Sequence, residues 1–142
     1  MLRYCTDRRL PLTDLRRQVL SLLCSQPRPV SAYQVIGLME CQMGHRLKPA
    51  SMYRILDFLV RNGLAVRIES RNAYVACAHP EWGRTDVFLL CDGCERAVAI
   101  PIPELTRVIE MDTAAIGFAV SRPVMEMHGT CATCREAGDV RR

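Results

Sequence analysis

Two CxxC pairs are the residues of this chain whose types and spacing best suit chemistry. Cys91 and Cys94 form the first pair, in CDGC, and Cys131 and Cys134 form the second, in CATC. Each pair places two sulfurs on one tight turn, so two such turns brought together supply the four thiolates of a tetrahedral zinc site. A site closed by four thiolates has no position for a substrate water. The spacing therefore predicts a structural zinc ion that clips the C-terminus to the end of an earlier strand.

The other four cysteines, Cys5, Cys24, Cys41 and Cys77, are scattered along the chain. Eight cysteines in 142 residues, half of them in CxxC pairs, favour zinc binding in a reducing compartment over disulfides. No apolar run approaches the roughly 20 residues that span a bilayer, and the N-terminus lacks the apolar stretch of an export signal. We therefore expect a cytoplasmic protein that does not associate with membranes.

The elements that must position these cysteines begin with three amphipathic helices, in which apolar residues recur at helical spacing. Thr13 is suited to the N-cap of the first helix, and Cys24 is expected to close its buried face. Ser31 and Gln34 predict a capping box at the start of the second helix, and Pro49 is suited to the first turn of the third. The predicted helices span 12–24, 31–43 and 49–62.

A hairpin is predicted after the helices, because the short strand-like runs LAVRIES and AYVAC follow one another closely. Three helices followed by a hairpin form a winged helix-turn-helix, in which the third helix lies in the major groove of DNA. The polar face of that helix carries Ser51, Tyr53 and Arg54, which would point at base edges and phosphates. The net charge of +4 is compatible with a nucleic-acid partner but does not establish one.

The character of the chain changes beyond Cys77. The runs VFLLC and RAVAI predict two strands, PELTRVIEMDTAAIG predicts a helix, and FAVSRPVMEMHG predicts a further strand. Within the helix, Leu105, Val108, Ile109 and Ile116 are expected to point inward. The chain is thus of the α+β class, with a winged-helix domain at 1–78, a hinge loop at 79–86 and a small α/β domain at 87–142.

Five segments, taken in order along the chain, resemble the ferric uptake regulator family, and the zinc uptake regulator branch most closely. They are LTDLRRQVL, SAYQVIGLM, PASMYRILDFLVRNGLAVRIESRNAYVAC, FLLCDGC and MEMHGTCATC. The resemblance implies a homodimeric bacterial transcription factor whose winged helix binds a palindromic DNA operator. It also implies that the domain at 87–142 dimerises and that metal loading closes the two winged helices onto the operator, repressing metal-uptake genes.

The resemblance also assigns roles to residues. Cys91, Cys94, Cys131 and Cys134 match the structural zinc ligands of the family. Tyr33 and Arg54 match positions that the family uses to contact DNA. Arginine suits bidentate contact to guanine, and a tyrosine reaches a phosphate or a thymine methyl group.

The sequence departs from the family at the sensing site for exchangeable zinc. Cys77 and His79 match two of its ligands, but Trp82 and Arg84 stand where further histidines are expected. Val66 and Ala99 stand at two more ligand positions of the family. Neither an indole nor a guanidinium donates a lone pair to zinc.

Three explanations of this departure remain open. Cys77 and His79 form a remodelled site with ligands recruited from Glu69, Glu81, Asp86 or His128. Alternatively, the site is lost, and the protein binds DNA constitutively or responds to another signal. The third explanation is a Cu(I) site, because Met39, Cys41, Met43 and His45 place soft donors close together in the sequence.

An enzyme that uses Cys77 as a nucleophile beside His79 is the rival from another functional class. Cys77 and His79 are two positions apart on an extended segment, and this spacing does not readily give a nucleophile–base pair. In addition, no Asp or Asn is placed to orient the base. We therefore expect a regulator and not an enzyme.

Overall fold

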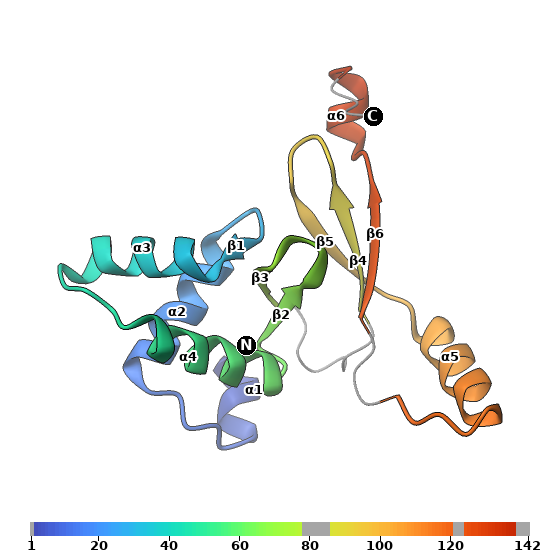
Figure 1. Cartoon of the computed structure of the whole chain (residues 1–142), viewed down its shortest axis with the longest axis horizontal. Coiled ribbons are helices and arrows are strands. Elements are labelled where there is room, and N and C mark those ends of the chain that lie inside the picture. The colour runs from blue at the N-terminus through green and yellow to red at the C-terminus, as the bar shows by residue number, and fades with distance from the viewer. Residues whose placement is uncertain (1, 78–85, 121–123, 139–142) are drawn as a thin grey trace. The chain divides into compact units, whose positions relative to one another are not determined.

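A computed structural model describes residues 2–77, 86–120 and 124–138. The chain divides into two compact units, residues 1–81 and 82–142, each with its own sheet (Figure 1). Within the described residues, no helix has both the length and the apolar character needed to cross a membrane.

The first unit is a helical layer completed by a small sheet. Its helices are α1 (Leu2–Asp7), α2 (Asp14–Ser25), α3 (Ala32–Met43) and α4 (Pro49–Arg61). Its strands are β1 (Val30–Ser31), β2 (Ala65–Ile68) and β3 (Ala73–Ala76), and the 3₁₀ turn η1 (Glu69–Arg71) joins the last two. The antiparallel sheet has the order β1-β3-β2. The predicted winged helix-turn-helix is confirmed.

The predicted helix boundaries follow from their caps. The Thr13 hydroxyl accepts a hydrogen bond from the Arg16 amide at 3.4 Å. The Ser31 hydroxyl accepts from the Gln34 amide at 3.2 Å, and the Gln34 side chain accepts from the Ser31 amide at 2.7 Å. These bonds satisfy amides that have no partner inside the helix. The helices α2 and α3 therefore begin directly after Thr13 and Ser31.

The core of the first unit is formed by the apolar faces of α2, α3 and α4 together with the hairpin. Fully buried members include Val19, Val35, Met39, Leu56, Leu59 and Leu64. Burial of one such side chain contributes about 1.5–3 kcal/mol. Because the apolar face of α4 packs into this core, its polar face points away from the core.

The sequence does not predict α1, and Cys24 differs from its prediction. In α1, Cys5 is buried in the core and the Tyr4 hydroxyl donates to the Asn62 carbonyl at 3.4 Å. Tertiary contacts of this kind stabilise a helix that is too short to form alone. Cys24 is exposed, so its predicted place on the buried face of α2 is wrong.

The second unit holds a three-stranded sheet and two helices. Its elements are β4 (Asp86–Cys91), β5 (Ala97–Pro101), α5 (Pro103–Ala115), β6 (Met125–Gly129) and α6 (Ala132–Glu136). The strand order is β5-β4-β6, with β5 antiparallel and β6 parallel to β4. The first two predicted strands and the long helix are confirmed, and the strand predicted at 118–129 is confirmed over Met125–Gly129. The short α6 was not predicted.

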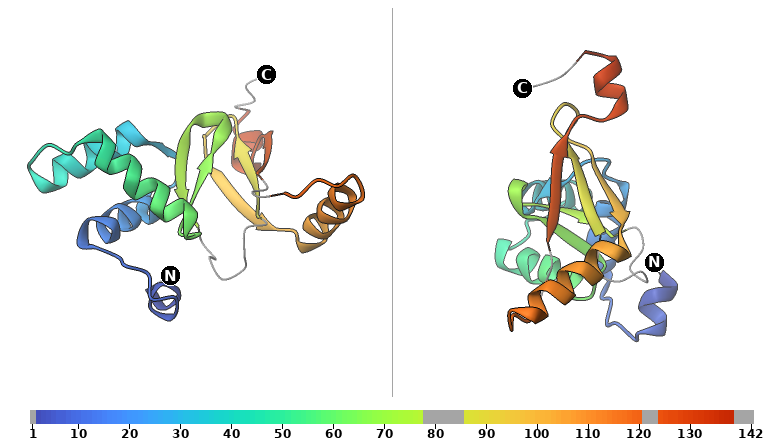
Figure 2. Two further views of the ribbon diagram at one scale, coloured as in Figure 1. Left: turned by 60° about the horizontal axis from the view of Figure 1, so that its bottom comes forward. Right: turned by 90° about the vertical axis from the view of Figure 1, so that its right-hand side faces the viewer.

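The apolar face of α5 is not covered by the other described residues of the second unit, contrary to expectation. Val108 is 53% exposed and Ile116, just beyond the helix, is 80% exposed. Leu105 and Ile109 are only half-buried. Figure 2 shows α5 beyond the end of the sheet and not across one of its faces. Periodicity predicted a helix correctly, but it did not reveal that the apolar side of this helix is largely exposed among the described residues of the second unit.

Candidate metal centre and nucleic-acid interface

The first CxxC lies on a tight turn at the end of β4. Cys91 is the last residue of β4, and its carbonyl accepts a hydrogen bond from the Glu95 amide at 3.0 Å. The Cys91 amide in turn donates to the Arg96 carbonyl at 2.9 Å. Glu95 adopts a left-handed conformation, with φ of 63°, which lets the chain reverse toward β5. The turn holds Cys91 and Cys94 on one side of the strand end.

The second CxxC opens α6, directly after β6. Cys131 is the N-cap of α6 and Cys134 lies within that helix. The parallel register pairs Cys91 with Gly129, and the Asp92 amide donates to the Gly129 carbonyl at 2.8 Å. Because β4 and β6 run in the same direction, their ends bring together two turns whose first cysteines are 40 positions apart.

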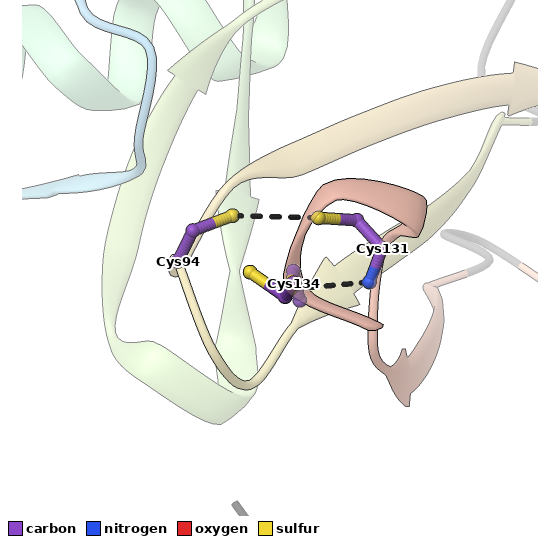
Figure 3. Close-up of side chains that lie close together, drawn as sticks. Cys94, Cys131 and Cys134 are labelled. Carbon is purple, nitrogen blue, oxygen red and sulfur yellow. Dashed lines mark hydrogen bonds between the residues drawn. The ribbon is translucent and has the colours of Figure 1, made fainter. Parts of the chain in front are cut away.

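The four sulfurs converge on one space. The Sγ atoms of Cys91, Cys94, Cys131 and Cys134 all lie within 4.8 Å of one another. The Cys94 and Cys131 sulfurs are 3.8 Å apart, and Figure 3 shows them facing each other with the Cys134 sulfur nearby. A disulfide would require about 2.05 Å. Zn–S bonds of about 2.3 Å in a tetrahedron separate the sulfurs by roughly 3.8 Å. The spacing therefore fits four ligands of one zinc ion.

The electrostatics of the cluster favour a bound cation. Hydrogen bonds from the Cys131 amide, at 3.3 Å from the Cys91 sulfur, and from the Cys94 amide lower the pKa of Cys91 to about 6. Hydrogen bonding to Cys131, followed by burial, raises the pKa of Cys134 to about 12. One thiolate thus forms readily while another is suppressed by its neighbours. A divalent cation would allow all four thiols to ionise together.

His128 and Asp92 flank the cysteine cluster. The His128 Nδ1 atom lies 3.2 Å from the Asp92 Oδ1 atom, and both side chains are partly exposed. Asp92 directly follows Cys91, and His128 lies on β6 opposite Leu90. The pair links the two strand ends beside the sulfurs, so His128 is engaged within the second unit.

The predicted DNA-reading face of α4 is accessible. Ser51, Tyr53 and Arg54 are exposed, whereas Met52, Ile55 and Leu56 on the other side of the helix are buried. Tyr33, in the first turn of α3, is 72% exposed. A large aromatic residue so exposed is available for contact with a partner. The four side chains belong to the first unit. They lie on α3 and α4, whose apolar faces are packed in the core of that unit.

The hairpin that forms the wing is braced at its turn. The Arg67 Nε atom lies 3.3 Å from a Glu69 carboxylate oxygen, and another Arg67 nitrogen donates to the Asn72 side chain at 2.8 Å. Asn72 is left-handed, with φ of 46°. This brace was not predicted, because its members are separated by a turn whose 3₁₀ form was not predicted either.

The structure brings no sensing site together within the described residues. Cys77 is buried directly after β3, and its amide donates to the Leu64 carbonyl at 2.9 Å. His79, Glu81, Trp82 and Arg84 lie outside the described residues. In the part of the chain that the structure describes, the four-cysteine cluster is the one group of three or more His, Cys, Asp or Glu placed to hold a metal.

The Cu(I) explanation loses its first donor in the structure. Met39 is fully buried in the core of the first unit, so its thioether is packed against other side chains. Cys41 is exposed, and the His45 ring contacts the Met43 carbonyl at 3.2 Å. Met39 therefore lies in the core while Cys41 lies at the surface of the same helix, which does not favour a shared ligand set.

The chain is similar in sequence to zinc uptake regulation proteins. No protein-family profile matches the chain. The zinc uptake regulation protein of Escherichia coli is 33% identical over 135 residues, which is 94% of this chain and 78% of that protein. The protein of the same name from Shigella flexneri matches to the same extent.

Two solved structures also match this chain over 94% of its length. The crystal structure of holo XcZur has a TM-score of 0.84 at 36% identity, covering 94% of this chain and 93% of that one. A zinc uptake regulator complexed with zinc and DNA has a TM-score of 0.88 at 32% identity, with coverage of 94% and 89%. Because each match covers 94% of this chain, both extend into each of the two units.

Proposed function

This chain belongs to the ferric uptake regulator family, in its zinc uptake regulator branch, and we propose that it represses metal-uptake genes by binding palindromic operator DNA as a homodimer in response to zinc. It is a transcriptional regulator and not an enzyme. The observation that carries this function is a likeness that covers 94% of the chain and includes a winged helix and a four-cysteine cluster. A reducing cytoplasm suits a protein that keeps four thiols available for zinc.

One structural zinc ion per chain is assigned to Cys91, Cys94, Cys131 and Cys134. Four sulfurs within 4.8 Å of one another support this assignment. The zinc, when bound, supplies cross-linking and charge neutralisation, and a closed set of four thiolates leaves no open position for catalysis. The residues of the chain supply the rest of the centre, because the Cys131 amide steadies the Cys91 sulfur and α6 carries Cys134.

The DNA contacts are assigned to Tyr33, Ser51, Tyr53 and Arg54. Exposure of all four side chains on α3 and α4 supports this assignment. Arg54 is suited to a bidentate contact with guanine in the major groove, and Ser51 and Tyr53 to bases or phosphates beside it. Tyr33 is suited to a phosphate or a thymine methyl group.

The domain limits proposed for this function are a winged helix at 1–78, a hinge loop at 79–86 and a dimerisation domain at 87–142. Apolar surface on the second unit supports its role in dimerisation. The register pairs Leu89 with Val98 on one side and with Met127 on the other, so the three exposed side chains form one row on one face of the sheet. Met111 on α5 is also exposed. A second copy of the chain would remove this surface from water.

Cys77 and His79 remain the candidate ligands of a second, regulatory zinc. The alternative is a family member whose sensing site is degenerate, so that it binds DNA constitutively or responds to another signal. Zinc content per chain distinguishes them. Two zinc ions per chain would support a regulatory site, whereas one would leave only the structural ion.

The function is tested by selecting duplexes from a random-sequence library with the zinc-loaded protein and then measuring gel shifts with and without a chelator. We expect a palindromic sequence to be enriched and bound in a salt-sensitive manner. Binding lost on chelation and restored by zinc supports the zinc response. Binding unchanged by chelation supports the constitutive alternative, and no selected duplex at any zinc loading would contradict the function.

A further inference from the structure

Glu40 closes the loop between α3 and α4 in two ways. Its backbone carbonyl accepts a hydrogen bond from the Gly44 amide at 2.9 Å, and Gly44 is left-handed with φ of 70°. Its carboxylate accepts a second hydrogen bond, from the Leu47 amide at 2.7 Å. The first bond ends α3, as is common where a helix stops at a left-handed glycine. The second bond reaches seven residues ahead and is not part of any helix.

The second bond fixes the residue that leads directly into α4. Leu47 precedes Lys48, which is the N-cap of α4 and provides no side-chain cap. The Leu47 side chain packs against the core. Its backbone amide is therefore tied to α3 while its side chain is tied to the core. The position and direction in which the chain enters α4 depend on both attachments.

This hydrogen bond is of a strong type. An ionised carboxylate accepts a shorter and stronger hydrogen bond from an amide than a neutral acceptor does. Glu40 is half-buried, so water competes less for the carboxylate than it would on an open surface. The Leu47 amide would lose its partner within the described residues if the carboxylate were removed.

We propose that Glu40 is a positioning residue for DNA recognition: its carboxylate holds the Leu47 amide and thereby sets the placement of α4 and of Arg54 against the operator. This role rests on the proposed function. It predicts that removal of the Glu40 carboxylate changes operator affinity in the direction opposite to that expected from charge alone. An acidic side chain on a DNA-binding domain repels phosphates, so simple charge removal would tighten binding, whereas loss of positioning would weaken it.

The test uses the duplex selected by the wild-type protein, a scrambled duplex of equal length, and two variants. Glu40→Ala removes the acceptor, and Glu40→Gln removes the charge but keeps an oxygen acceptor at the same reach. Gln42→Ala, an exposed change in the same turn of α3, is the matched control. Affinity for both duplexes is measured by fluorescence anisotropy, and exchange of the Leu47 amide proton is measured by NMR.

We expect Glu40→Ala to bind the selected duplex about tenfold more weakly, since a hydrogen bond to a charged group is lost, with no loss of affinity for the scrambled duplex. Exchange of the Leu47 amide should accelerate in the same variant. Glu40→Gln should restore most of the selected-duplex affinity, and Gln42→Ala should behave as wild type. Equal or tighter binding of the selected duplex by Glu40→Ala would overturn the proposal, as would an equal loss in Glu40→Gln.

Two further outcomes keep the test decisive. If Glu40→Ala does not fold, Glu40→Asp keeps the charge and shortens the reach, and we expect it to bind the selected duplex about threefold more weakly; wild-type affinity would overturn the proposal. A wild-type protein that selects no duplex contradicts the proposed function itself. A wild-type protein that selects one, together with variants that bind it equally well, contradicts only the role of Glu40.

Discussion

The two units of this chain differ in how completely they bury their own apolar residues. In the first unit, α2, α3, α4 and the hairpin enclose a continuous core that one chain completes. In the second unit, α5 contributes no buried residue and Leu89, Val98 and Met127 are exposed on the sheet. A small domain with little core needs a metal or a partner to be stable. This difference supports our proposal that zinc and a second copy complete the second unit, whereas the first unit needs neither.

Loss of zinc should produce the largest difference between the units. We expect Cys91→Ser or Cys134→Ser to lose the metal and to loosen the dimer, because structural zinc contributes about 10–16 kcal/mol in small zinc domains. The helices of the first unit should persist. Zinc content by mass spectrometry and sedimentation of the protein measure the two effects. Cys41→Ser, at an exposed cysteine, is the control. A variant with full metal content and an intact dimer would contradict the zinc assignment.

A core truncation in the first unit should act independently of zinc. We expect Leu56→Ala to lower the free energy of unfolding of the winged helix by about 2–5 kcal/mol, since Leu56 is fully buried. The loss should be the same with and without a chelator, as measured by urea unfolding followed by circular dichroism. A loss that depends on zinc would show that the two units do not unfold separately.

A charge in the exposed row of the second unit should separate the dimer. We expect Met127→Asp to weaken dimerisation by about 2 kcal/mol or more, because an interface side chain would become an unpaired charge. Analytical ultracentrifugation at several concentrations measures the change, and zinc content should stay at the wild-type value. Met127→Leu keeps the apolar volume and serves as control. Unchanged dimerisation of Met127→Asp would place the interface elsewhere.

Removal of a DNA contact should leave both units intact. We expect Arg54→Ala to reduce specific operator binding by about 1–3 kcal/mol, the range for one bidentate base contact. Thermal unfolding and zinc content should not change, because Arg54 is exposed and outside the core. Arg54→Lys should recover only part of the affinity, since a lysine lacks the planar fork. Unchanged affinity for the selected duplex would remove Arg54 from the interface.

Much of the first unit was predictable because its signals are local. Thr13, Ser31 and Gln34 mark helix starts by bonds made within a few residues, and the structure contains those bonds. The short α1 was not predictable, since it is stabilised by contacts with residues far along the chain, such as that between Tyr4 and Asn62. Local patterns report the first kind of interaction and not the second.

The functional residues also fall into two groups, those that local patterns predict and those that depend on contacts between distant residues. The CxxC spacing predicts zinc by itself, because two sulfurs on one turn suit few other roles. The exposure of Val108 and Ile116 was not predictable, since an apolar helical face looks the same whether its cover comes from the same chain or from a second copy. Glu40 gave no signal either, because its partner is a backbone amide, which every residue but proline carries.

The sequence alone predicted α2 to α5, the side-chain caps of α2 and α3, the two metal-binding turns and the polar face of α4, because each depends on residues close together in the chain. Tertiary packing determines which distant parts of the chain come into contact. Parallel pairing of β4 with β6 unites two cysteine pairs that begin 40 residues apart, and the Glu40 carboxylate meets the Leu47 amide across a loop. Such contacts depend on how the whole chain closes on itself, and no local repeat of residue types records that closure.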